Sequence, residues 1–236
     1  AFRRLAAVAA FAAFPALAAN LTIGLGTDVT SIDPHFHNLT PNNNVAQHLY
    51  GYLVGRSEKS QAEPGLATEW KTIDPLTWEF KLRRGVKFHD GSEITAEDVL
   101  FSLDRPALIP NSPGSFTSYT KPIVARQAVD RYTVRLKTAS AYGPLPLDLI
   151  SIFIVSKKAA VNATQEQFNA GKAAVGSGPF KLVSFRKGEN IEIARHDAYW
   201  GEKPEWDKVQ FKVLASDAPR LAALLDGGRN GLGILC

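Results

Sequence analysis

The sequence predicts a mixed α/β protein in which short strand hairpins alternate with capped helices, and three observations support this fold class. First, Trp78, Phe80 and Leu82 alternate with polar residues, the period-2 pattern of a strand with one buried face. Second, a turn signal after this strand leads into a capping box from Thr95 to Asp98, which marks the start of a helix. Third, two further pairs of alternating segments are each joined by a short polar turn.

The size and composition of the chain bound its class. A chain of 236 residues is long enough for one large domain or two small ones, each with its own core. With 45% hydrophobic and 21% charged residues, the composition is that of an ordinary globular protein. The net charge of +4 comes from scattered Lys and Arg residues, without the basic stripe that binds nucleic acid. We therefore expect no nucleic-acid partner, and we also expect a monomer.

Residues 1–18 have the pattern of a secretory signal peptide. Arg3 and Arg4 form a charged start, an alanine-rich apolar run follows, and Ala16-Leu17-Ala18 fits a cleavage site. The apolar run is too short to span a bilayer comfortably. The pattern predicts export through a cleaved signal peptide, and the one cysteine, Cys236, excludes an intramolecular disulfide.

Three elements are expected after the leader. The alternating segment 21–26 predicts a short strand, and the loop that follows contains Pro34, which restricts Asp33 and prevents a helix there. A polar loop is expected over 38–44 and a helix over 45–53.

The rest of the chain continues as hairpins and short helices. The segment 104–119 is rich in Pro, Ser, Asn and Gly, which predicts a long loop of the kind that often carries function. The remaining expected elements are a hairpin of 123–128 with 132–137, a buried strand at 152–155, a helix capped by Ser156 that runs to 160, a helical turn at 165–168, a hairpin of 180–185 with 191–195, a strand at 209–213, and a helix capped by Ser216 that runs to 225. The last residues, 227–236, fit no element and predict an aberrant tail.

Candidate sites for chemistry are few. His35 and His37 could form a metal pair, but no Cys or carboxylate lies at ligand spacing, so hydrogen-bonded loop histidines are favoured. The Gly176-Ser177-Gly178 turn is not followed by Lys-Ser or Lys-Thr at the spacing of a phosphate-binding loop, and a strand is expected after it in place of a helix, so a structural turn is favoured. Glu97 and Asp98 are explained by a helix N-terminus, where negative charge is stabilising. Since no catalytic motif occurs either, we expect a protein that is not an enzyme and uses no cofactor and no metal.

One stretch carries a family resemblance. Residues 80–99, which include Val86-Lys87-Phe88-His89-Asp90-Gly91 and Thr95-Ala96-Glu97-Asp98-Val99, resemble the signature of the family 5 extracellular solute-binding proteins, the peptide- and nickel-type receptors of ABC importers. Further motifs that match this family are Ile32-Asp33-Pro34, Tyr50-Gly51-Tyr52-Leu53, Gly176-Ser177-Gly178-Pro179-Phe180 and Tyr199-Trp200-Gly201. The resemblance covers nearly all of residues 19–226, which correspond to the N-terminal portion of a family member.

The resemblance implies a fold and a function. The expected fold is the N-terminal lobe of a two-lobe periplasmic binding protein, with the second lobe missing from a truncated chain. The implied domains are a lobe I sheet domain made of 19–55 with 175–226, and an inserted α+β subdomain over 56–174. The implied function is that of a periplasmic receptor that closes by hinge motion on a small peptide or polar solute and delivers it to an inner-membrane ABC permease.

The resemblance also implies ligand-binding residues. We expect Thr40 and Asn44 from the polar loop, Phe116 and Tyr119 from the end of the long loop, and Ile152 from the buried strand to form a wall of the ligand site. Two alternatives remain open: a receptor for a metal chelate, as in nickel-type relatives, and an exported enzyme. The metal-chelate receptor is less favoured because the residues around Ile152 offer no positive side chain to hold the carboxylates of a chelate.

Overall fold

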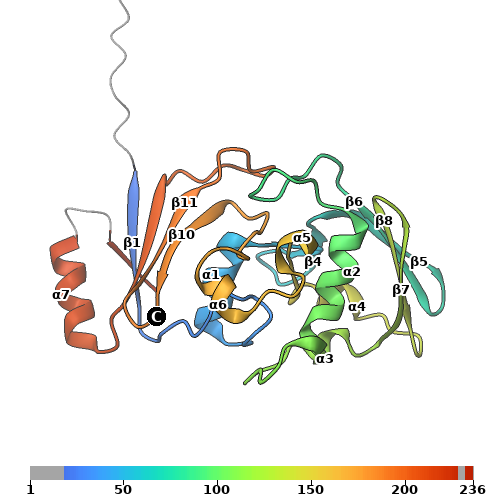
Figure 1. Ribbon diagram of the computed structural model, residues 1–236, viewed down its shortest axis with the longest axis horizontal. Helices are drawn as coiled ribbons and strands as arrows, with labels where there is room; N and C mark the ends of the chain where they lie inside the picture. Colours follow the sequence, from blue (N-terminus) through green and yellow to red (C-terminus); the bar gives the residue numbers. More distant parts are fainter. Residues whose placement is uncertain (1–18, 228–231, 236) are drawn as a thin grey trace, which may run out of the picture.

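The computed structural model describes residues 19–227 and 232–235 (Figure 1). The expected signal peptide, residues 1–18, and Cys236 lie outside the described residues. The fold is mixed α/β, which confirms the fold class expected from the sequence. Two larger sheets stand at opposite ends of the long axis, and most of the helices lie between them (Figure 1). Within the described residues, no helix has the length and hydrophobicity that a membrane span requires.

The first sheet has five strands in the order β10-β11-β12-β1-β13. Its strands are β1 (Asn20–Leu25), β10 (Phe180–Arg186), β11 (Asn190–Arg195), β12 (Lys208–Val213) and β13 (Leu232–Leu235). β1 runs parallel to both of its neighbours, β12 and β13, whereas β10, β11 and β12 are antiparallel. The predicted hairpin of 180–185 with 191–195 is therefore confirmed. We expected no helix or strand within 227–236, and the presence of β13 corrects that prediction.

The second sheet has four antiparallel strands in the order β5-β6-β8-β7. Its strands are β5 (Ala67–Asp74), β6 (Thr77–Leu82), β7 (Ile123–Asp130) and β8 (Thr133–Thr138). Phe80 and Leu82 of β6 are buried and Trp78 is half-buried, as the alternation predicts. Two smaller sheets pair β2 (Gly51–Tyr52) with β9 (Phe153–Ile154), and β3 (Val54–Arg56) with β4 (Ala62–Pro64).

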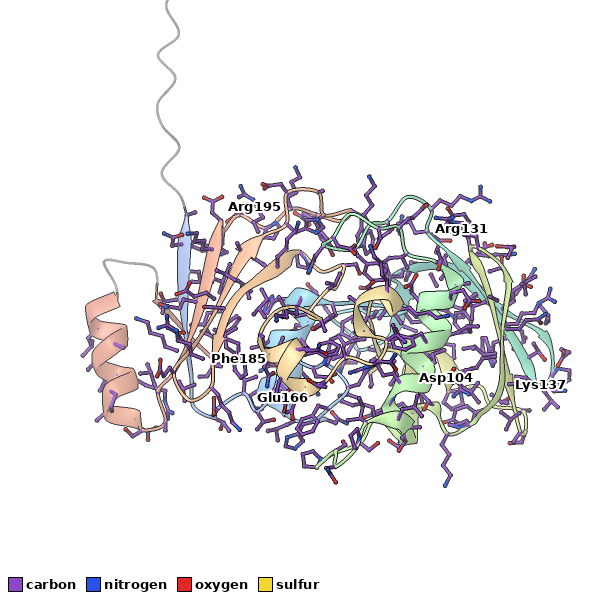
Figure 2. The ribbon with its side chains drawn as sticks, viewed as in Figure 1. Asp104, Arg131, Lys137, Glu166, Phe185 and Arg195 are labelled. Carbon is purple, nitrogen blue, oxygen red and sulfur yellow. The ribbon has the colours of Figure 1, made fainter. Side chains whose placement is uncertain are left out.

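The helices are short. They are α1 (Thr40–Leu49), α2 (Ala96–Asp104), the 3-10 helix η1 (Arg105–Leu108), α3 (Thr117–Thr120), α4 (Leu145–Leu149), α5 (Lys157–Ala160), α6 (Gln165–Asn169) and α7 (Asp217–Gly227). α2 packs on the four-stranded sheet, while α1 and α6 lie on the inner side of the five-stranded sheet and α7 on its outer side (Figure 1). Side chains fill the space between these layers (Figure 2).

Capping residues begin several helices where the sequence predicts. The backbone N–H of Thr95 donates to Asp98 Oδ2 over 2.9 Å, and the Thr95 hydroxyl donates to the same oxygen over 2.8 Å. The other oxygen of Asp98 accepts from the backbone N–H of Lys157 over 2.9 Å, so this cap also holds the start of α5. Ser156 caps α5, as expected, and Thr164 caps α6.

The start of α1 corrects the sequence analysis. We expected a polar loop over 38–44 and a helix over 45–53, but the helix begins at Thr40 and ends at Leu49. Pro41 lies in its first turn, where a missing backbone N–H has no cost. Tyr50 is already extended, with φ −120° and ψ 153°, and the chain enters β2 directly. The run of asparagines, residues 42–44, is therefore part of the helix and not of a loop.

The long loop expected over 104–119 is also shorter in the structure. Pro106 lies in the first turn of η1, which continues directly from α2, and α3 then takes residues from Thr117 onward. Only the middle of the segment remains irregular, where Ser112 donates to the carbonyl of Phe36 over 2.7 Å and Asn38 donates its N–H to the carbonyl of Gly114 over 2.7 Å. The segment is thus fixed against the loop that precedes α1.

Two hydrophobic cores lie side by side, and one short segment belongs to both. Ile152 and Ile154 are buried in the core beneath the four-stranded sheet, whereas Phe153 and Val155 are buried in the core beneath the five-stranded sheet. Successive side chains of an extended segment point to opposite faces, so this alternation joins the two cores. The core of the five-stranded sheet also takes in Phe168 of α6.

Candidate functional site

A cleft with a volume of about 800 Å³ opens where α1, the β2–β9 pair and the β3–β4 hairpin meet. This is within the size range of small-molecule sites in proteins. The cleft lies next to the joint between the two cores, since Tyr50, Tyr52 and Phe153 contribute to its lining. A site at the junction of two packed units is a common location for ligand binding.

Amide side chains of α1 form one wall of the cleft. Asn43 and Gln47, and likewise Asn44 and His48, are four residues apart, so each pair lies on one side of the helix. The Asn43 amide donates to Asn38 Oδ1 over 2.8 Å, and the Asn38 amide lies 3.5 Å from the Tyr119 hydroxyl. These contacts orient the polar groups of the wall before any ligand arrives.

His48, in the last turn of α1, completes this wall of the cleft, and its side chain is uncharged. Its ring lies 5.9 Å from the ring of Phe180 and 5.7 Å from that of Phe211, measured between centroids. Burial among these rings lowers the pKa of His48 below its usual value of 6.5. The imidazole is therefore neutral at pH 7 and offers one hydrogen-bond donor and one acceptor.

Aromatic rings form the floor of the cleft. Tyr52 and Phe153 are paired across β2 and β9, and their ring centroids are 4.6 Å apart. Burial raises the pKa of the Tyr52 hydroxyl well above its usual value, so the phenol stays protonated. This floor combines apolar contact area with a hydroxyl that can donate a hydrogen bond.

A second aromatic pair, Tyr199 and Trp200, closes the cleft from the segment after β11. Their ring centroids lie 5.5 Å apart. The Arg83 guanidinium lies 4.9 Å from the centroid of the Trp200 ring, in the geometry of a cation–π contact. Arg83 belongs to the stretch that carries the family resemblance, so this contact ties that stretch to the cleft.

The β3–β4 hairpin supplies charge at the rim. Arg56, Glu58 and Glu63 are exposed side chains that line the opening. Arg56 donates to the Ser60 hydroxyl over 2.8 Å, which folds its guanidinium over the hairpin's own loop. The walls and floor thus carry no formal charge, and the charged side chains that line the cleft lie at its entrance.

Of the five residues predicted to bind ligand, two line the cleft and three do not. Asn44 and Tyr119 line the cleft together. Thr40 is exposed at the first position of α1 and does not line the cleft. Phe116 and Ile152 are each only 1% exposed, because both are packed into the core beneath the four-stranded sheet.

Several lining residues were not singled out from the sequence. Tyr52 and Trp200 lie in the Tyr50-Gly51-Tyr52-Leu53 and Tyr199-Trp200-Gly201 motifs, which served only to identify the family. The β3–β4 hairpin gave no signal, because each of its strands has only three residues, of mixed type, and their pairing depends on the tertiary fold. Motif positions that carry an aromatic residue were the available clue.

The two histidines considered as a metal pair have separate roles. His35 Nε2 lies 2.8 Å from the carbonyl of Phe153, and His37 Nδ1 lies 3.1 Å from the Thr30 hydroxyl. Among the residues that the structure describes, no three His, Cys, Asp or Glu side chains lie close enough together to hold a metal ion. The groups that line the cleft are hydrogen-bonding side chains of α1 and aromatic rings.

Comparisons with known proteins give matches over most of the chain. The sequence model of the bacterial extracellular solute-binding proteins, family 5 (middle), matches residues 61–230. The chain is 29% identical over 223 residues to the oligopeptide-binding protein AppA of Bacillus subtilis, which covers 92% of this chain and 41% of AppA. It is also 29% identical to the glutathione-binding protein GsiB of Salmonella choleraesuis, covering 92% of this chain and 42% of GsiB.

A solved structure gives the same result. The structure of Bacillus subtilis AppA in complex with a nonapeptide matches with a TM-score of 0.81 at 28% identity, covering 91% of this chain and 44% of that one. The chain thus spans about four tenths of the length of the curated relatives it matches. The similarity extends over almost all of the described fold.

Proposed function

The chain belongs to the family 5 bacterial extracellular solute-binding proteins, and on that premise we propose that its cleft binds a peptide or a similar small polar solute for an ABC importer. The observation that carries the proposal is the cleft itself, with an amide wall, an aromatic floor and charges at the rim. Amide groups and neutral rings suit a ligand with many hydrogen-bonding groups and little buried charge. The related proteins are named for binding an oligopeptide and glutathione, and both of these ligands contain peptide amide groups that could hydrogen-bond to such a wall.

The proposal includes the location and the partner. A receptor of this type works outside the cytoplasm, in the periplasm, and passes its solute to a membrane permease. The leader-like residues 1–18 support export. Residues 19–55 with 175–226, and residues 56–174, remain our proposed division into a sheet domain and an inserted subdomain, with the cleft at their junction. The proposed function is binding without a chemical reaction, and the related proteins are likewise named for binding.

Two of the predicted residues are proposed to contact the ligand directly. Asn44 offers its amide from α1, and Tyr119 offers its ring and hydroxyl from α3. Phe116 supports Tyr119 from behind, with a distance of 6.4 Å between ring centroids. Ile152 precedes Phe153 and sits on the opposite side of that segment, so it acts on the cleft only through the position of its neighbour.

A thermal-shift titration tests the proposal. The purified protein is heated with glutathione, with a set of tri- to pentapeptides and with nickel–histidine. Ligand at a hundred times its Kd stabilises a protein by about 2.7 kcal/mol, which corresponds to a rise in Tm of about 5–10 °C for a chain of this size. We expect a peptide-type solute to produce the rise. A rise with nickel–histidine alone would favour the metal-chelate alternative.

Matched variants locate the binding. Asn44→Ala and Tyr119→Ala are each expected to weaken binding about tenfold, which reduces the ligand-induced rise in Tm to about half. Each rise is measured from the ligand-free Tm of the same variant. Gln127→Ala, at an exposed position of β7 on the other sheet, serves as the control. An equal ligand-induced rise in all three variants would place the binding outside this cleft.

A further inference from the structure

Two motifs identified in the sequence contact each other next to the cleft. Of their residues, Pro179 contributes to the lining. The first is the histidine turn, residues 88–91, which is closed by a hydrogen bond of 2.9 Å from the N–H of Gly91 to the carbonyl of Phe88. The second is the glycine turn, residues 176–179. The histidine turn follows β6 of the four-stranded sheet, and the glycine turn leads into β10 of the five-stranded sheet. Their contact therefore joins the two halves of the fold.

His89 makes three hydrogen bonds to the glycine turn. Its backbone N–H donates to the carbonyl of Gly176 over 2.8 Å. Its ring accepts from the backbone N–H of Gly176 at Nδ1, over 3.3 Å, and lies 3.2 Å from the carbonyl of Gly178 at Nε2. Because Nδ1 faces a donor and Nε2 faces an acceptor, only the neutral tautomer with its proton on Nε2 satisfies both contacts.

The surroundings of His89 oppose its protonation. Burial lowers the pKa of His89 to about 4. His196 lies 5.0 Å away between ring centroids, with Nδ1 3.4 Å from the same Gly178 carbonyl, and Lys181 donates to the His89 carbonyl over 3.1 Å. The carboxylate of Asp90 favours protonation of His89, but it accepts from Ser92 and lies 3.9 Å from the Lys158 ammonium.

The other side of the glycine turn rests on the end of α1. The N–H of Gly178 donates to the carbonyl of Leu49 over 3.0 Å. A Cβ atom at Gly176 would lie 2.0 Å from the Leu49 carbonyl oxygen, and one at Gly178 would lie 2.5 Å from that of His48. The turn can approach this closely only because both positions are glycine. Real Cβ atoms do not come within such distances of a backbone oxygen.

We propose that His89 is a positioning residue for the cleft, which holds the glycine turn in place and through it the last turn of α1. This inference rests on the proposed function of the cleft, because Gln47, His48 and Tyr50 at the end of α1, and Pro179 of the glycine turn, line it. The two family motifs are then parts of one support: the histidine turn holds the glycine turn, and the glycine turn sets the position of the amide wall.

The first test needs no ligand and no variant. NMR of the protein labelled with ¹⁵N-histidine reports the tautomer and the titration of each imidazole. We expect His89 to carry its proton on Nε2 and to titrate near pH 4. A proton on Nδ1, or titration near the ordinary value of 6.5, would overturn the proposal, because the contact with the Gly176 N–H would then be absent.

The second test uses variants that retain part of the hydrogen bonding. Hydrogen–deuterium exchange, corrected for intrinsic rates, is followed at residues 44–50 and 176–180. In His89→Ala we expect protection at both segments to fall by about tenfold or more, since buried donors and acceptors lose their partners. His89→Asn, which keeps an acceptor near Nδ1, and His89→Gln, which keeps a donor near Nε2, should give intermediate values. His37→Gln is the matched control, because that ring contacts neither turn.

The readouts separate this inference from the proposed function. If the thermal-shift titration finds a ligand, His89→Ala should weaken its affinity by about tenfold while His37→Gln leaves it unchanged. If no solute binds at all, the proposed function fails, while exchange and tautomer still decide whether His89 positions α1. Unchanged protection at residues 44–50 in His89→Ala would refute the positioning role, whatever the ligand result.

Discussion

Asp33 and Arg105 form a bidentate ion pair inside the protein. Asp33 Oδ1 lies 2.6 Å from Arg105 Nη1 and Asp33 Oδ2 lies 2.7 Å from Arg105 Nη2, with side chains that are only 2% and 5% exposed. The guanidinium also lies 4.5 Å from the centroid of the Phe168 ring. His35 continues the network, since its Nδ1 is 3.3 Å from Arg105 Nη1 and its Nε2 is 2.8 Å from the Phe153 carbonyl. The pair thus ties the loop before α1 to η1, α6 and β9.

Removing one partner of this pair should be strongly destabilising. In Arg105→Met, Asp33 would remain as a buried carboxylate without a counter-charge, which costs about 3–5 kcal/mol in comparable buried pairs. Urea unfolding monitored by tryptophan fluorescence gives the change in the free energy of unfolding. Arg131→Met is the control, because Arg131 forms an ion pair with Glu93 at the periphery (Figure 2), where such pairs contribute about 0–1 kcal/mol. Equal losses in the two variants would contradict a structural role for the buried pair.

The close approach of the glycine turn to α1 predicts a large effect of a single methyl group. In Gly176→Ala the new Cβ would meet the Leu49 carbonyl, so either the turn or the helix end must move, at a cost of about 3 kcal/mol or more. Gly143→Ala is the matched control, because nothing lies within 4 Å of a Cβ at that position. We expect its stability to change by about 0.5 kcal/mol or less. Similar midpoints of urea unfolding for both variants would show that the turn is not held against the helix.

The elements that the sequence predicted well are those defined by local patterns. The alternation in β6, the hairpin of β7 with β8 and the cap at Thr95 each depend on neighbours in the chain, and the structure confirms them. α1 was placed too late, because a run of asparagines has low helix propensity, whereas burial of Val45 and Leu49 together with a proline in the first turn favours the helix.

The site was less accessible to sequence reasoning, because its members come from distant segments. Asn44 and Tyr119 were predicted and do line the cleft, but Phe116 precedes Tyr119 by one helical turn and points into the core instead. The polar composition around Phe116 indicated a surface position, whereas its burial comes from packing into the core beneath the four-stranded sheet, where α3 lies against α4. The pairing of Asp33 with Arg105, 72 residues apart, likewise has no local signal.

Mutation of Phe116 should mainly lower stability, whereas mutation of Tyr119 should mainly lower ligand affinity. Phe116→Ala removes a fully buried ring and should lower the free energy of unfolding by about 3–5 kcal/mol. Tyr119→Ala removes a half-buried ring at the cleft, so we expect a smaller loss of stability and a fall in affinity of about tenfold for a solute found by thermal shift. Urea unfolding and calorimetric titration of both variants give the comparison. A loss of affinity confined to Phe116→Ala would reverse the assignment of the two residues.

Acid should destabilise the protein well before its carboxylates are protonated. His35 and His89 have pKa values lowered to about 4, mainly by burial, against 6.5 for an unfolded histidine. Between pH 6.5 and 4 the unfolded chain therefore binds more protons, so stability is fully present above pH 6.5 and is lost as the pH falls toward 4. Each histidine contributes a slope of about 1.4 kcal/mol per pH unit in the middle of this window.

Urea unfolding at pH 7.5, 6.0, 5.2 and 4.5 measures this slope, and variants assign it. His89→Gln should reduce the slope by about one proton's worth, about 1.4 kcal/mol per pH unit, even if it lowers stability at pH 7.5. Gln127→Ala, which removes no ionisable group and lies at an exposed position of β7, should leave the slope unchanged. The carboxylates of Asp74 and Glu93, whose pKa values are lowered by hydrogen bonds from backbone N–H groups, lose their contribution only at lower pH. In the structure, Nδ1 of His35 and Nδ1 of His89 each face a hydrogen-bond donor, so neither ring can take up a proton there without losing that contact. A flat profile between pH 6.5 and 4.5 would therefore contradict this prediction.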